Sequence, residues 1–352
     1  MSALSPLPTL SAIEDKCKDI FGKTPCQFQS LLCLWQLQQK NIISISPTGS
    51  GKTLTFWLPL LFSPTSIIII ITALNVLGDQ FVAQLREVGF PAVAVTASND
   101  NDITFSVSVV ISKFGKSIHV FAIYQNIRSG QFRVVIFNPE TVTKRNGRCD
   151  KYLWNYAPFI TKVLNVIFDE GHCISQWGDT FREDYSQVGK LRWFLPNTPF
   201  YVTSATLPTA VLQDVKQKLQ MPETTSIMRR SNDRWNIVYA VREMKYHQST
   251  YADLGFLIPV DWQTGNNPIP AKFLVFFNSK REAEEAAKFL KSRLPFELRD
   301  RVHWLHSGMT AAFRTDEIKN MVEGEQWGLL LTDIGGMVSR TSSGKASVLP
   351  CH

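Results

Sequence analysis

Residues 42–53 join an apolar run to a glycine-rich turn and a Lys-Thr pair, and this order restricts the fold more than any other part of the chain. Residues 42–45 are typical of a buried strand, residues 46–53 read Ser-Pro-Thr-Gly-Ser-Gly-Lys-Thr, and residues 54–61 favour a helix. This succession is typical of a phosphate-binding loop, because glycines let consecutive backbone N–H groups point at one anion. Ser46 stands where the plain pattern has a glycine, so an ordinary turn between strand and helix is the alternative.

The loop predicts a site for the phosphates of a nucleotide together with Mg²⁺. The backbone N–H groups and the partial positive charge of a helix start both attract phosphate. Lys52 would neutralise the β- and γ-phosphates, and the Thr53 hydroxyl would bind the metal. The residues expected to hold the nucleotide here are Thr48, Gly49, Ser50, Gly51, Lys52 and Thr53.

A second candidate group, Asp169 and Glu170, follows the apolar run at residues 163–168. Catalytic groups in open parallel sheets lie at the carboxyl ends of strands, which is where this pair falls. Asp169 would hold Mg²⁺ through its water shell, and Glu170 would orient and deprotonate the attacking water. The alternative is that the pair only caps the next helix, a common use of such residues.

Strand-like and helix-like segments alternate along the chain, which predicts an α/β fold with doubly wound parallel sheets. The expected strands are residues 42–45, 67–71, 92–95, 134–137, 163–168, 201–203, 237–241, 273–277, 302–305 and 328–331. The expected helices include residues 27–39, 77–87, 210–219 and 282–290. Two domains are expected, at residues 1–228 and 229–337, and the Ser-rich residues 338–352 are expected to be a disordered tail.

Composition limits the classes of protein that remain. A length of 352 residues suits about two domains, and a net charge of +7 suits a polyanionic partner or simply a solvated, slightly basic surface. The six cysteines form no C-x-x-C pair and no secretory leader is visible, so reduced thiols in an intracellular protein are expected. No apolar run has the length of a membrane span, and His172-Cys173 lacks a second ligand pair for zinc.

The most diagnostic motif is the run at residues 169–178 (DEGHCISQWG), which is followed by Phe181, Arg182 and Tyr185. With it, the chain from about Phe21 to Met337 resembles the RecQ family of superfamily-2 DNA helicases, in particular its fungal members. In this resemblance Trp177 and Phe181 offer faces for unpaired bases, and Arg182 adds charge toward phosphates. Ordinary core packing of these aromatic residues is the alternative.

Further segments carry the same resemblance. Residues 21–29 are similar to the adenine-recognition motif of the family, and Gln29 lies 23 residues before Lys52, at the family's spacing. His172 and residues 203–206, with Thr203, Ser204 and Thr206, are similar to elements that link the nucleotide state to domain closure. The remaining similar segments are residues 71–74, 79–80, 138–140, 231–236, 276–279 and 306–309.

The resemblance implies two RecA-like domains of the P-loop NTPase class, with ATP and Mg²⁺ in the cleft and single-stranded DNA across both. It also implies ATP-driven 3′-to-5′ unwinding of partly duplex DNA in repair and recombination. A nuclear location is expected from the family alone, because no basic import cluster is visible.

Three departures from the family pattern are visible. No arginine precedes Gln29, residues 103–121 look like an insertion, and Val338 and Arg340 stand where the family has glycine and aspartate. No later segment resembles motif VI, so an incomplete second domain is expected. A module that binds ATP and nucleic acid without unwinding is therefore an alternative. A transporter or signalling ATPase is another, and residues 175–185 argue against it.

Overall fold

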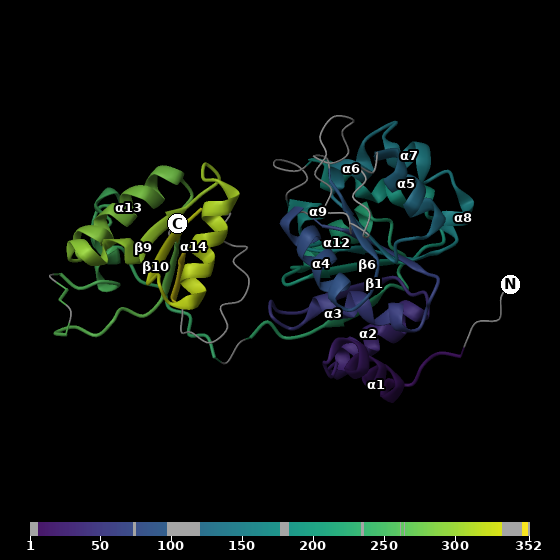
Figure 1. Cartoon of the computed structure of the whole chain (residues 1–352), viewed down its shortest axis with the longest axis horizontal. Helices are drawn as coiled ribbons and strands as arrows, with labels where there is room; N and C mark the ends of the chain where they lie inside the picture. Colours follow the sequence, from purple (N-terminus) through teal and green to yellow (C-terminus); the bar gives the residue numbers. More distant parts are fainter. Residues whose placement is uncertain are drawn as a thin grey trace, which may run out of the picture. The chain divides into compact units, whose positions relative to one another are not determined.

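The computed structural model describes residues 6–72, 75–96, 120–176, 183–233, 236–260, 262–263, 265–332 and 347–350. The chain divides into two compact units, Met1–Arg234 and Trp235–His352 (Figure 1). The insertion expected at residues 103–121 lies outside the described residues, except for the two residues that begin helix α5 (Val120–Ser129).

The first unit is built on a seven-stranded parallel sheet in the order β3-β4-β2-β5-β6-β1-β7. Its strands are β1 (Ile42–Ile45), β2 (Ile67–Ile71), β3 (Ala92–Val95), β4 (Val134–Phe137), β5 (Val163–Phe168), β6 (Phe200–Ser204) and β7 (Ser226–Arg229). All residues of β1 to β6 are buried, because helices cover both faces of the sheet. That is why these strands read as largely apolar runs in the sequence.

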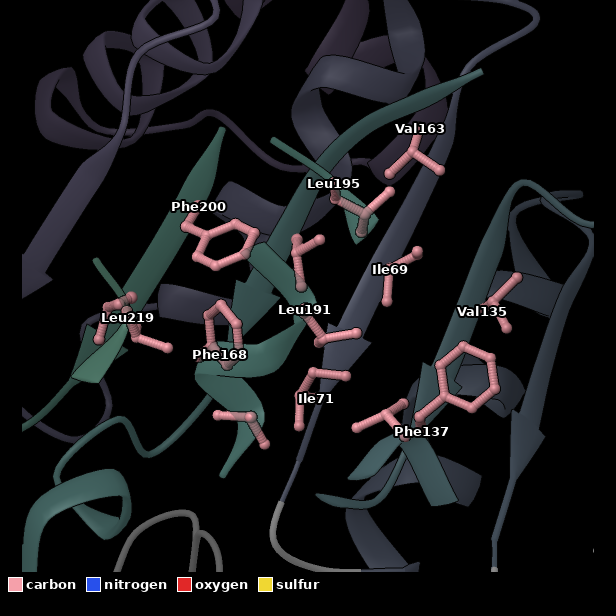
Figure 2. Packing of buried hydrophobic residues seen from close by; sticks show 14 of the residues in the cluster. Ile69, Ile71, Val135, Phe137, Val163, Phe168, Leu191, Leu195, Phe200 and Leu219 are labelled. Carbon is pink, nitrogen blue, oxygen red and sulfur yellow. The ribbon is translucent and has the colours of Figure 1, made fainter. Parts of the chain in front are cut away.

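Alternate residues of each strand enter two separate cores. One core contains Ile69, Ile71 and Phe137, and Figure 2 shows these side chains packed with Phe168, Phe200 and others. The helices that cover this face are α5, α6 (Pro139–Thr143), α7 (Arg148–Tyr152), α8 (Ala157–Ile160), α9 (Cys173–Gln176), α10 (Glu183–Ser186), α11 (Leu191–Phe194) and α12 (Thr209–Lys218). The opposite face packs on α2 (Gln27–Leu37), α3 (Lys52–Trp57) and α4 (Asn75–Glu87). Helix α1 (Leu10–Phe21) packs on α2 and on the 3₁₀ turn Leu58–Leu61.

The second unit has a four-stranded parallel sheet in the order β11-β8-β10-β9. Its elements are β8 (Phe273–Phe276), α13 (Lys280–Ser292), β9 (Val302–Leu305), α14 (Ala311–Glu323), β10 (Gly328–Leu331) and β11 (Ser347–Pro350), with 3₁₀ turns at Gln248–Thr250, Ala252–Phe256 and Phe296–Arg301. Helix α13 packs its alanines on one face of this sheet, while Met321 of α14 packs in the core on the other.

Two expectations about secondary structure are wrong. Residues 237–241 form no strand, although their apolar character suggested one: Val238 is 91% exposed and Val241 is 102% exposed. An apolar extended segment becomes a strand only where a neighbouring strand accepts its hydrogen bonds, and here no described strand does. The tail is not disordered throughout, because Ser347–Pro350 pair with β8 as an edge strand. Residues 338–346 lie outside the described part of the chain.

Among the described residues, no helix combines the length and the apolar character that a membrane span requires.

Candidate nucleotide-binding site

Strand order brings three sequence-distant segments to one edge of the first sheet. Strand β6 lies between β1 and β5, so the residues that follow these three strands are neighbours. The N–H of Ser46, after β1, donates to the carbonyl of Ser204 at 3.1 Å, and the N–H of Gly171, after β5, donates to that of Thr203 at 2.9 Å. The phosphate loop and the Asp169-Glu170 pair are thus bonded to the same strand end.

Residues 46–51 form a loop with two left-handed glycines, Gly49 at φ 82° and Gly51 at φ 78°. Residues with a side chain rarely adopt this conformation, so the glycines let the loop turn back over the start of α3. Ser46, which replaces the glycine of the plain pattern, is fully buried, and its hydroxyl accepts a hydrogen bond from that of Ser50 at 3.2 Å. The serine is therefore accommodated within the loop rather than disrupting it.

Gln29 connects the first turn of α2 to this loop. Its Nε2 donates to the Gly51 carbonyl at 2.9 Å, and its Oε1 accepts from the Cys26 N–H at 2.8 Å. A Cβ atom at position 51 would lie only 2.5 Å from the Gln29 Nε2, so the contact depends on glycine there. In this structure the Gln29 side chain is buried and bonded to protein at both ends.

Lys52 begins α3, and its ammonium group lies inside the loop. Nζ donates to the carbonyls of Ser46 at 3.0 Å and Pro47 at 3.3 Å. Burial lowers the pKa of Lys52, and the negative charges of Glu170 and Asp169 act in the opposite direction. The lysine and the two carboxylates are therefore electrostatically coupled. Thr53, the next residue, is half-buried.

Asp169 is 7% exposed and is fixed by its backbone, because its N–H donates to Ile71 and its carbonyl accepts from the Tyr185 hydroxyl at 2.6 Å. Burial, helped by the nearby Glu170 charge, raises the pKa of Asp169 to about 7, against the opposing effects of the Glu170 N–H and Lys52. A buried carboxylate with too little positive charge around it is a favourable ligand for a cation. The described residues contain no cluster of three His, Cys, Asp or Glu side chains that could hold a metal alone. Mg²⁺ in proteins is commonly bound by one or two carboxylates together with substrate phosphates.

The raised pKa of Asp169 predicts how stability depends on pH. The folded state holds the proton of the Asp169 carboxyl group more tightly than the unfolded state does. The contribution of this proton to the stability of the fold is therefore fully present below about pH 4 and is lost as pH rises toward 7. Without metal or nucleotide, Asp169→Asn is therefore expected to raise the free energy of unfolding by on the order of 2 kcal/mol at pH 8. Denaturant unfolding at pH 8 and pH 4.5 checks this, and an equal effect at both pH values would contradict it.

Glu170 has a left-handed backbone at φ 50°, which is uncommon for a residue with a side chain. Its N–H donates to the Asp169 carboxylate at 3.0 Å, and its own carboxylate Oε2 lies 3.4 Å from Nδ1 of His172. This backbone turn directs the two carboxylates to different sides, so that of Asp169 is buried while that of Glu170 is partly exposed.

Gly171 makes this turn possible because there is no room for a side chain. A Cβ there would lie 2.3 Å from Cγ1 of Val202. Gly171→Ala is expected to destabilise the first unit by about 1–3 kcal/mol through overpacking. Gly78→Ala in α4 is the matched control, because its Cβ would meet neighbours at 3.5 Å, and alanine favours a helix. Thermal unfolding of the two variants compares them, and equal melting temperatures would contradict the expectation.

His172 joins Glu170 to the end of β6. Its Nδ1 lies 3.0 Å from the Ser204 hydroxyl, which donates to the Thr206 carbonyl at 3.0 Å and accepts from the Thr206 N–H at 3.3 Å. Because the Ser204 proton is used toward Thr206, the proton between His172 and Ser204 belongs on Nδ1. Thr203 contributes through its carbonyl, which accepts from Gly171. Of the residues expected to link the nucleotide site to domain closure, His172, Ser204 and Thr206 thus form one hydrogen-bonded chain, while Thr203 is bonded separately to Gly171.

Trp177, Phe181 and Arg182 lie outside the described residues, so their proposed contact with nucleic acid stays a prediction. Tyr185, which lies on the described side of this segment, also donates its hydroxyl to the Ile71 carbonyl at 3.3 Å. The Tyr185 hydroxyl is therefore bonded to the backbone of both Ile71 and Asp169.

Sequence reasoning missed several residues that shape the site. The Tyr201 hydroxyl lies 2.8 Å from that of Thr55 and joins β6 to α3, and burial raises the pKa of Tyr201 to about 12. After β7, the Asn232 amide donates to the Ala205 carbonyl at 2.7 Å, so the chain leaving the first unit is bonded to the 203–206 segment. A polar residue inside an apolar strand signals the first contact, but no local pattern signals the second.

The first unit has a parallel α/β sheet, and three motifs lie at neighbouring strand ends: a glycine loop with a lysine, an Asp-Glu pair and a Ser-Ala-Thr segment. This combination is that of a P-loop NTPase of the helicase type. A family model described as DEAD/DEAH box helicase matches residues 24–215, more than half of the chain. The chain belongs to this family.

Curated relatives support the RecQ resemblance. The chain is 26% identical over 239 residues to ATP-dependent DNA helicase Q1 of Mus musculus, covering 67% of this chain and 34% of that protein. It is 26% identical over 257 residues to ATP-dependent DNA helicase RecQ of Haemophilus influenzae, covering 73% of this chain and 36% of that protein. The chain thus spans about one third of the length of the curated relatives that it matches. Its RecQ-like character is confirmed.

The fold also has a match among solved structures. The crystal structure of the DUF1998 helicase MrfA bound to DNA and AMPPNP aligns with a TM-score of 0.65 at 13% identity. The alignment covers 99% of this chain and 51% of that one. At this identity the match shows the fold alone, and it confirms the RecA-like α/β architecture expected from the sequence.

Proposed function

We propose that this chain is the motor region of a RecQ-type helicase, which hydrolyses ATP to move 3′-to-5′ along single-stranded DNA and to open duplex DNA during repair or recombination. The observation that carries this proposal is the coupling of Lys52 with Asp169 and Glu170, on strand ends that β6 brings together. The names of the relatives, which are ATP-dependent DNA helicases, support ATP and DNA as ligands.

The proposed roles follow from the geometry. The loop N–H groups at residues 48–53 and the Lys52 ammonium bind the phosphates, and Lys52 exchanges the Ser46 and Pro47 carbonyls for phosphate oxygens. Thr53 and Asp169 would hold Mg²⁺, which offsets the charge on the phosphates. Glu170 accepts the proton of the attacking water at its carboxylate, which the left-handed turn directs away from Asp169.

The connection to DNA would run through the segment after α9. Trp177 and Phe181 would stack bases and Arg182 would bind phosphate, and Tyr185, three residues after Arg182, is bonded to the Asp169 carbonyl. The His172–Ser204–Thr206 chain gives Glu170 a second connection, to the chain that leads out of the first unit. A change at Tyr185 or at Thr206 can thus alter the orientation of Glu170, the proposed catalytic base.

A tryptophan substitution tests this coupling. Trp177→Ala is expected to reduce the stimulation of ATP hydrolysis by single-stranded DNA by roughly 5-fold or more, the effect of losing one base-stacking contact, while basal hydrolysis is retained. Trp193→Ala is the matched control, because Trp193 is 68% exposed on α11 and is given no role in the site. Equal stimulation of the unaltered protein and Trp177→Ala would contradict the assignment.

A further inference from the structure

Arg230 directly follows β7, the edge strand that pairs with β1. Its N–H donates to the carbonyl of Ile45 at 2.8 Å. Ile45 is the last residue of β1, and the phosphate loop begins with the next residue. The backbone of Arg230 therefore lies beside the start of the phosphate loop.

The Arg230 side chain stacks on an aromatic ring at the start of α2. Its guanidinium carbon lies 4.4 Å from the centroid of the Phe28 ring. Phe28 is only 8% exposed and packs in the core with Leu32 and Ile42, so the ring is a fixed platform. Arg230 itself is exposed, and within the described part of the chain no carboxylate forms an ion pair with it. Its charge is not neutralised there by a salt bridge.

The Phe28–Arg230 stack is joined to the phosphate loop from two sides. Gln29, the neighbour of Phe28, donates to the Gly51 carbonyl at 2.9 Å, and Arg230 donates to Ile45. Helices α2 and α3 lie next to one another in the first unit (Figure 1). The start of α2 contains no basic residue of its own, since the N-cap Cys26 is followed by Gln27, Phe28 and Gln29.

From this geometry we propose that Arg230 binds the base of the nucleotide whose phosphates lie in the loop, with the base stacked on the guanidinium plane. The inference rests on the proposed nucleotide site. A guanidinium group is planar and weakly hydrated, so it stacks well on flat rings, and Phe28 holds it in one orientation. Every purine offers a suitable face, so Arg230 strengthens the binding of ATP and GTP alike and does not select between them. The loop and Lys52 bind the phosphates, while Arg230 binds the opposite end of the ligand.

Calorimetric titration with two probes in Mg²⁺ buffer tests this assignment. ATP carries a base, and inorganic tripolyphosphate carries only the phosphate chain. Arg230→Ala is expected to weaken ATP binding by roughly 3- to 30-fold, the range for one cation–π contact, and to leave tripolyphosphate binding unchanged. Arg230→Lys keeps the charge but lacks the plane, so it is expected to resemble Arg230→Ala. Arg229→Ala, which removes the adjacent exposed arginine, is the matched control and is expected to bind both probes normally.

Kinetics give a second readout, because loss of a contact made equally in the ground and transition states raises KM for ATP and leaves kcat unchanged. Unchanged ATP affinity in Arg230→Ala, or an equal loss for tripolyphosphate, would overturn the inference. Full ATP affinity in Arg230→Lys would also overturn it, since charge alone would then suffice. If the unaltered protein bound neither probe, the proposed nucleotide site would fail, and this inference with it.

Discussion

Lys52→Ala is expected to lower ATP turnover by at least about 100-fold, the scale of losing one group that stabilises charge in a transition state. The Lys52 ammonium is the positive charge coupled to Asp169 and Glu170, and it lies against the Ser46 and Pro47 carbonyls at the point where phosphate would enter. The alanine variant keeps the loop glycines but loses this charge, so nucleotide affinity is expected to fall as well. Steady-state hydrolysis and calorimetric titration with ATP measure the two effects.

Lys151→Ala is the matched control for this experiment, because Lys151 is exposed on α7, outside the nucleotide site. Both variants are expected to fold, since Lys52 lies at a helix start and its removal leaves the core intact. Unchanged ATP affinity and turnover in Lys52→Ala would refute the assignment of residues 46–53 as a phosphate-binding loop.

Glu170→Gln is expected to reduce kcat by about 10²–10⁴-fold, the contribution of a general base, and to leave ATP binding nearly intact. Glutamine matches glutamate in shape and can still accept the contact with His172, but it cannot take a proton from water. Glu223→Gln provides the control, because Glu223 is exposed and pairs with Lys216, outside the nucleotide site. A variant that hydrolyses ATP at the unaltered rate would show that Glu170 is not the base.

Strand positions in the first unit were predictable because burial on both faces leaves a clear pattern. Residues 42–45, 67–71, 92–95, 134–137 and 163–168 were predicted as strands, and the structure confirms their bounds. The prediction at 201–203 was too short, since β6 also includes Phe200 and Ser204. The helix expected at 54–61 begins at Lys52 and ends as a 3₁₀ turn that contains Pro59, which lacks a backbone donor.

Contacts between distant segments could not be read from the sequence. Tyr185 and Asp169 are joined by a side-chain-to-backbone bond, and Arg230 stacks on Phe28 across about two hundred residues of chain. Neither contact depends on local periodicity. At residues 237–241 a local pattern was present but misleading, because the apolar residues suggested a strand where the structure has an exposed chain. Motif spacing did indicate the residues near Lys52 and Asp169, while their roles stay predictions.

Turnover of ATP in response to single-stranded DNA is the activity on which the proposed function depends. Steady-state ATP hydrolysis with and without single-stranded DNA, beside Glu170→Gln, tests it most directly. Hydrolysis is expected to rise when DNA is added and to be lost in the variant, with duplex unwinding as the next assay. ATP binding without turnover, with or without DNA, would show that this chain is not a motor and would favour a module that only binds nucleotide.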